Sequence, residues 1–173
     1  MSHHAEKPFY VFANEIVTRV LGTSFKVRAF PEDRDITVAV KTGSVSVRKK
    51  KKTNSVLSDE DIVLMPNQQA VYSRHSDKIF RMLVKDPKVI LPEEEMKNII
   101  RFDGAPVSEI FQALEKMYGV AIVFDPEAFS SCSLTTSGSG QSLYQTLDII
   151  CEAIGATYVV EDVQVKINGM GCN

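Results

Sequence analysis

The chain has 173 residues, of which 44% are hydrophobic and 24% charged, and its formal net charge is −2. This length suits one domain or two small ones, and the charge disfavours nucleic acid or an anionic membrane surface as a partner. The sequence holds no apolar run of the roughly 18 residues that a membrane-spanning helix needs, and its polar start, residues 1–7, lacks a signal-peptide pattern.

The first half of the chain is predicted to be all β. Residues 8–84 contain short runs in which apolar and polar side chains alternate, and turn-forming residues separate these runs at short intervals. Within residues 20–28, Gly22 permits a bend, and Phe25 and Val27 then alternate with Lys26 and Arg28. No helical period interrupts this half, so we expect a β-sandwich or stacked β-strands over residues 1–84.

The second half has a different pattern. Residues 85–97 are polar, contain two prolines and are predicted to be a linker, with room for a short helix after Pro92. Residues 98–173 form the predicted C-terminal domain, in which one face of residues 106–118 and one face of residues 142–154 are apolar, as in amphipathic helices. Strands are predicted around these helices, at residues 99–102, 120–124, 134–136, 157–160 and 163–167.

The two helical segments repeat. A shift of 36 residues superposes Val107 on Leu143, and Gly119, which ends the first helix, on Gly155, which ends the second. Ser142 and Gln145 match a capping box at the start of the second helix. The repeat predicts two βαβ units, with both helices on one face of a small sheet. The fold class is therefore α+β with an all-β N-terminal half.

The sequence lacks a recognisable catalytic or metal site. Cys132, Cys151 and Cys172 form no CxxC pair, and the three histidines lie elsewhere in the sequence, which disfavours zinc. Cys151 falls on an apolar helix face, and the sequence leaves open whether one pair of cysteines forms a disulfide. No GxSxG or P-loop pattern is present. We therefore expect a binding module, not an enzyme, without a cofactor.

Three charged or glycine-rich stretches have alternative interpretations. The cationic run at residues 48–52 resembles a nucleic-acid patch, but it lacks interleaved aromatic residues and suits a solvated hairpin tip better. The acidic runs at residues 59–61 and 93–95 suit solvated turns and a helix start better than acid–base catalysis. The loop at residues 137–142 lacks the lysine of a phosphate-binding loop.

Several motifs resemble those of the FecR family, bacterial anti-sigma regulators that are abundant in Bacteroidetes. Residues 20–28, VLGTSFKVR, resemble the VLGTxFxVR core of the family, and residues 7–9, 40–47 and 64–70 resemble its flanking motifs, with Asn67 at a usual glycine. Residues 102–110, 114–120 and 142–150 resemble the C-terminal domain that follows FecR domains. That domain is similar to the short βαβ domain of secretins and TonB-dependent transducers.

The resemblance implies a periplasmic, signal-sensing role. The intact regulator is anchored in the inner membrane and holds a sigma factor through its cytoplasmic N-terminal part. Its periplasmic part contacts the N-terminal signalling domain of a TonB-dependent outer-membrane transporter and thereby controls release of the sigma factor. The family's FecR domain begins upstream of residue 7, so we expect a fragment without the cytoplasmic segment and the transmembrane helix.

We expect contact with the transporter to use a sheet edge, because small βαβ domains expose strand edges. The candidate partner-binding residues come from two predicted strands and are Val163, Val165, Ile167, Val120, Ile122 and Phe124. An unpaired edge in the N-terminal half could also pair two copies into a homodimer. The alternative function is a self-associating structural or assembly module related to secretin βαβ domains.

Overall fold

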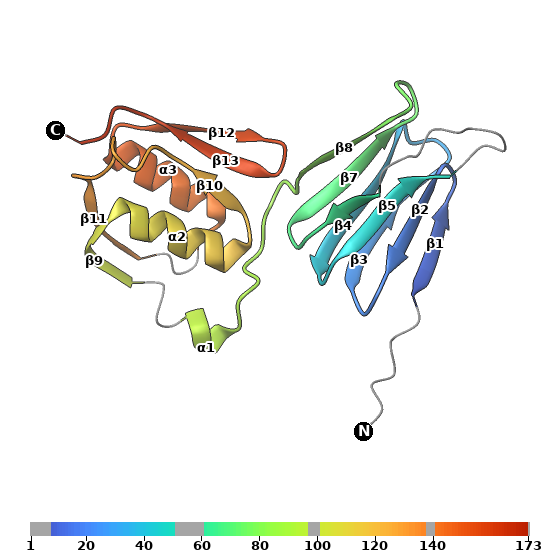
Figure 1. The fold of residues 1–173 in the computed structure, drawn as a ribbon, viewed down its shortest axis with the longest axis horizontal. Helices are drawn as coiled ribbons and strands as arrows, with labels where there is room; N and C mark the ends of the chain where they lie inside the picture. Colours follow the sequence, from blue (N-terminus) through green and yellow to red (C-terminus); the bar gives the residue numbers. More distant parts are fainter. Residues whose placement is uncertain (1–7, 51–60, 97–100, 138–140, 173) are drawn as a thin grey trace. The chain divides into compact units, whose positions relative to one another are not determined.

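The computed structural model describes residues 8–50, 61–96, 101–137 and 141–172. The chain divides into two compact units, residues 1–84 and residues 85–173, and each is described by itself (Figure 1). The predicted fold class, α+β with an all-β N-terminal half, is confirmed. Parts of the cationic run at residues 48–52 and of the acidic run at residues 59–61 lie outside the described residues.

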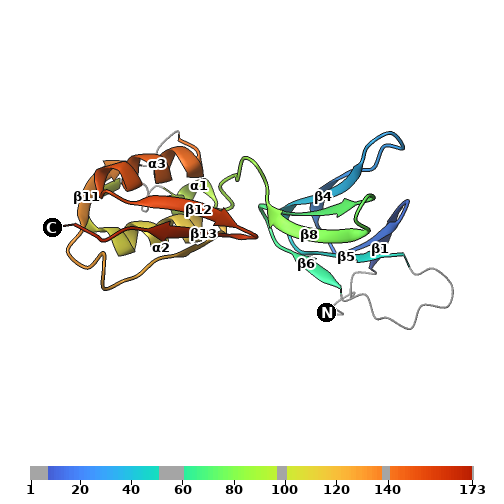
Figure 2. The ribbon, with the colours of Figure 1, turned by 90° about the horizontal axis from the view of Figure 1, so that it is seen from above.

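The N-terminal unit is a sandwich of two antiparallel sheets. One sheet has the strand order β1-β2-β5-β6 and the other β3-β4-β7-β8, and they form two layers in Figure 2. The strands are β1 (Phe9–Ala13), β2 (Ile16–Val20), β3 (Ser24–Arg28), β4 (Asp35–Thr42), β5 (Val45–Lys49), β6 (Ile62–Leu64), β7 (Gln68–Ser73) and β8 (Lys78–Leu83).

Alternation of apolar residues builds the core between these sheets. In β4, Ile36, Val38 and Val40 are buried while the residues between them are not, as expected for a strand with one face on a core. Asn67 takes the left-handed conformation, with φ 64°, that the substituted glycine of the family motif would also permit.

Strand β1 is an edge strand of unusual composition. Among the described strands it pairs only with β2, across a two-residue turn at Asn14 and Glu15. The large apolar side chains of Phe9, Tyr10 and Phe12 are exposed. Edge strands of soluble proteins are usually protected by charge or by a covering segment, and Phe9–Ala13 contains no charged residue.

A polar network closes one end of the sandwich. The Nη1 atom of Arg74 donates hydrogen bonds to the carbonyl oxygens of Phe30, Pro31 and Asp33 at 3.3, 2.9 and 2.6 Å. The hydroxyl of Tyr72 donates to Asp77 Oδ1 at 2.7 Å. Burial and, next, this hydrogen bond raise the pKa of Tyr72 to about 12, because both disfavour a phenolate beside the Asp77 carboxylate.

The C-terminal unit contains two βαβ segments and one further strand. Its elements are α1 (Glu93–Met96), β9 (Arg101–Pro106), α2 (Val107–Tyr118), β10 (Ala121–Val123), β11 (Ser133–Ser137), α3 (Leu143–Ala153), β12 (Thr157–Glu161) and β13 (Gln164–Asn168). Within the described residues, the strands form two sheets and not one: β9 pairs with β11, and the other sheet has the order β10-β13-β12.

Capping residues in the local sequence set the ends of the predicted helices. Gly119 follows α2 with φ 62°, a conformation that glycine adopts without strain, and its N–H donates to the Glu115 carbonyl. Ser142 and Gln145 form both hydrogen bonds of a capping box at the start of α3, at 3.3 and 2.9 Å. The short helix expected after Pro92 is confirmed as α1.

A disulfide joins Cys132 to Cys172, and Cys151 is a free, buried thiol. The bridge holds the last residues of the chain against the loop before β11. The Ser131 hydroxyl donates to the Cys172 carbonyl at 2.8 Å. A Cβ atom on Gly171 would lie 1.7 Å from the Ala128 carbonyl oxygen, so only glycine fits there. We call residues 169–172 with this bridge the C-terminal clasp.

Candidate protein-docking edge

One of the two candidate partner-binding segments, residues 163–167, lies at the centre of the three-stranded sheet. Strand β13 pairs in parallel with β10 and antiparallel with β12, so strands flank it on both sides (Figure 1). The expectation that residues 163–167 form a free edge is therefore wrong. Val165 and Ile167 have exposed fractions of 0% and 4% because they point into the core, and Val163 lies in the turn before β13. Alternation of apolar residues identified the strand but not its neighbours.

The second predicted segment is at an edge, but much of it is covered. Val120 and Ile122 are buried, and the Phe124 ring packs on Phe111 with centroids 5.1 Å apart. The Ile122 N–H donates to Glu115 Oε1 at 2.6 Å. A carboxylate of α2 thus occupies a backbone donor of β10 that an added strand would need, which is a common form of edge protection.

Strand β12 forms the opposite edge of this sheet. The sequence predicted a strand there, at residues 157–160, but did not identify it as a candidate docking edge. A two-residue turn at Asp162 and Val163 joins β12 to β13, with Glu161 opposite Gln164. Residues that flank such a turn exchange hydrogen bonds, and the pattern then alternates along the strand. The backbone N–H and C=O groups of Tyr158 and Val160 therefore point away from β13, toward the open side.

The exposed side chains of β12 are apolar on both faces. Val159 and Val160 are 43% and 45% exposed although they point to opposite faces of the sheet. Val160 shares its face with the buried Val165, which lies opposite it, and so it points to the helix side. The signal in the sequence was the pair of adjacent valines in TYVVE, which is unusual at an edge strand.

Helix α3 borders this edge with an aromatic pair. The rings of Tyr144 and Tyr158 are stacked, with centroids 6.3 Å apart and an interplanar angle of 3°. The Tyr158 hydroxyl donates to Asp148 Oδ1 at 2.9 Å, which fixes the ring against the helix. Burial and, next, the hydrogen bond to Asp148 raise the pKa of Tyr158 to about 12, so it is a hydrogen-bond donor at neutral pH.

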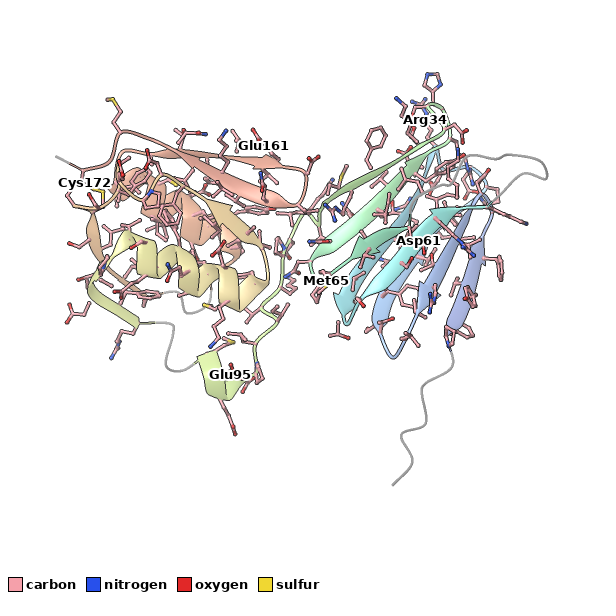
Figure 3. The ribbon with its side chains drawn as sticks, in the orientation of Figure 1. Arg34, Asp61, Met65, Glu95, Glu161 and Cys172 are labelled. Atoms are coloured by element: carbon pink, nitrogen blue, oxygen red, sulfur yellow. A yellow bond between two sulfur atoms is a disulfide. The ribbon has the colours of Figure 1, made fainter. Side chains whose placement is uncertain are left out.

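The charge around this edge is negative. Asp148 and Glu152 are exposed on α3, and Glu161 and Asp162 are exposed at the hairpin, where Figure 3 labels Glu161. Lys166, opposite Val159 on the outer face, is the sole cation in the described strands β10, β12 and β13. We call β12, the Tyr144–Tyr158 pair and these four acids the β12 edge.

Cys151, the free thiol, lies in α3 beside the acids of this edge. Burial and then the Asp148 carboxylate raise the pKa of the Cys151 thiol to about 11, which keeps it protonated and weakly nucleophilic. Within the described ranges, no three His, Cys, Asp or Glu side chains gather as metal ligands. In the same ranges, no helix has the length and apolarity that a membrane span requires.

A comparison with protein families agrees with the resemblance drawn from the sequence for the C-terminal domain. Residues 99–167 match the family described as FecR, C-terminal, which confirms the resemblance of the C-terminal domain to that of the FecR family. No curated protein matches the sequence. The chain is similar to two crystal structures, at 2.50 and 1.65 Å resolution, of a proposed anti-sigma factor from Parabacteroides distasonis ATCC 8503. Identity is 24% in both, the TM-score is 0.39, and the matches cover 96% and 97% of this chain and 73% and 74% of those chains.

Proposed function

Because residues 99–167 belong to the FecR C-terminal family, we propose that this chain is the periplasmic, signal-sensing part of an anti-sigma regulator. In this role it contacts the N-terminal signalling domain of a TonB-dependent outer-membrane transporter. The contact controls release of an extracytoplasmic-function sigma factor, which the cytoplasmic part of the regulator holds. The family match is the observation that carries this proposal.

The disulfide supports a periplasmic location. The bridge between Cys132 and Cys172 is of a kind that persists in oxidising compartments, including the bacterial periplasm, and that is rare in the cytosol. Cys151, in contrast, is buried in α3 and needs no partner.

Titration calorimetry tests the proposed function. The chain is titrated with the N-terminal signalling domain of the TonB-dependent transporter encoded nearest its gene. We expect saturable one-to-one binding under oxidising conditions. A signalling domain from an unrelated transporter is the control. Absence of binding to every signalling domain encoded in the same genome would contradict the proposal.

A self-associating assembly module is the second candidate, and the apolar edge of β1 favours it. The turn at Asn14 and Glu15 directs the free backbone groups of Tyr10 and Phe12 outward, by the same alternation as in β12. Two copies could therefore pair antiparallel about Val11, with Tyr10 opposite Phe12. Sedimentation velocity over a concentration series tests this pairing. A monomer at all concentrations excludes it, and a dimer that Phe12→Lys abolishes supports it.

A further inference from the structure

We propose that the β12 edge binds an extended, basic segment of the protein partner, which adds to the sheet beside β12 as a fourth strand. The inference rests on the proposed function, since it names the surface through which the sensing part contacts its partner. It also corrects the location expected from the sequence, because β13 is central and β10 carries the Glu115 carboxylate on its edge.

The backbone of β12 supplies the affinity. The N–H groups of Tyr158 and Val160 find no partner among the described residues, and alternation in the hairpin directs them to the open side. An added strand takes up these donors and the two carbonyl groups of the same residues. Strand addition of this kind uses main-chain hydrogen bonds for affinity and alternate side chains for specificity.

The side chains of β12 define which segment fits. On the helix side, the added strand presents every second residue to Val160 and to the stacked rings of Tyr144 and Tyr158. On the outer face, it presents the remaining residues to Val159. Cross-strand pairs of aromatic and β-branched residues are favourable, so the partner strand should carry apolar side chains at positions on both faces.

The acids around the edge predict that the partner segment is positively charged. Glu161 and Asp162 lie at one end of β12, and Asp148 and Glu152 lie along α3 beside it. Lysine or arginine side chains at the ends of the added strand would meet these carboxylates. Complementary charge of this kind raises association rates and excludes wrong partners more than it adds affinity, so binding should weaken with salt.

Two matched substitutions test the edge against the rest of the sheet. Val160 on β12 is 45% exposed and Val123 on β10 is 44% exposed, so Val160→Lys and Val123→Lys place the same charge at equally exposed edge positions. The transporter signalling domain is the probe. Val160→Lys should weaken its binding, because the apolar packing of Val160 is lost even though the new lysine can still contact the acids around the edge. Val160→Pro removes the outward N–H group but removes none of the hydrogen bonds between β12 and β13.

We expect Val160→Pro to raise the Kd by about tenfold or more, and Val123→Lys to change it by less than about twofold. The double variant Glu152→Lys with Glu161→Lys should slow association and flatten the salt dependence. Protection of Cys151 from thiol reagents verifies that each variant is folded. Amide hydrogen exchange of the wild-type complex gives an independent readout, and the Tyr158 and Val160 amides should become protected.

The outcomes separate this inference from the function on which it rests. If the wild type binds and the Tyr158 and Val160 amides stay unprotected, or Val160→Pro binds like the wild type, the β12 edge is not the docking surface and the proposed function stands. If the wild type binds none of the signalling domains, the proposed function fails and this inference with it. Loss of binding in Val160→Pro together with amide protection supports both.

Discussion

Replacing Cys132 and Cys172 with serine should destabilise the C-terminal unit by about 4 kcal/mol. The bridge joins residues 40 apart in the sequence. In the chain-entropy account, cross-links stabilise by about 3 kcal/mol for a 15-residue loop and about 4.7 kcal/mol for a 100-residue loop, so this one lies between them. The effect acts on the unfolded chain, which the bridge deprives of conformational freedom.

Cys151 provides the assay. It is the one thiol left in the oxidised wild type and in the double serine variant, and it is buried in α3. A thiol reagent reaches it only when the unit opens, so the labelling rate reports the free energy of opening. A loss of about 4 kcal/mol predicts labelling roughly a thousandfold faster in the variant.

Two controls make the result decisive. In urea the wild type and the variant should label at equal rates, because the thiol is then accessible in both. The wild type with its bridge reduced should be as unstable as the serine variant, with labelling read at Cys151 alone because reduction also frees Cys132 and Cys172. Labelling rates of the folded proteins that agree within about tenfold would refute the reasoning, because the bridge would then contribute little to the state that shields Cys151.

Two further predictions concern single side chains. Ser142→Ala removes the capping box with Gln145 and should lower the free energy of unfolding by about 1 kcal/mol, measured by urea denaturation followed by circular dichroism; no change would contradict the cap's role. Because the pKa of Tyr72 is raised from about 10 when unfolded to about 12 when folded, its contribution is present below pH 10 and is lost as the pH rises toward 12. Between pH 9 and pH 11, the free energy of unfolding should therefore fall less in Tyr72→Phe than in the wild type. An equal fall in both proteins would contradict the raised pKa of Tyr72.

Local sequence predicted the helices of the C-terminal unit well, because local interactions determine them. Val107 and Leu143 begin α2 and α3 and are fully buried, as their equivalent places in the 36-residue repeat predict. Gly119 and Gly155 both take positive φ after their helices. The strands between the helices were also located to within about two residues, which is ordinary for alternation patterns.

The arrangement of strands was not predictable from these patterns. Residues 163–167 have an apolar face whether they lie at the centre or at the edge of a sheet, so alternation cannot distinguish the two positions. The parallel pairing of Ala121–Val123 with Gln164–Lys166 depends on packing across many intervening residues. Of the six candidate partner residues, Val120, Ile122, Val165 and Ile167 are buried, and the exposed Val160 was not among the candidates.

The choice of disulfide partners also needed the fold. Cys132 lies before β11 and Cys172 beyond β13, and only the folded unit brings their Cα atoms to 5.3 Å. Burial of Cys151 on the inner side of α3 was predictable, because its position on the apolar face follows from helical periodicity.

The central place of β13 has a consequence for biogenesis. Residues 164–168 leave the ribosome after β10 and β12, yet both strands hydrogen-bond to them. The three-stranded sheet thus cannot assemble before β13 has been synthesised. Among the described strands, β13 is the partner of both β10 and β12 in this sheet. Under the proposed periplasmic location, the C-terminal clasp would close only after the chain reaches an oxidising compartment.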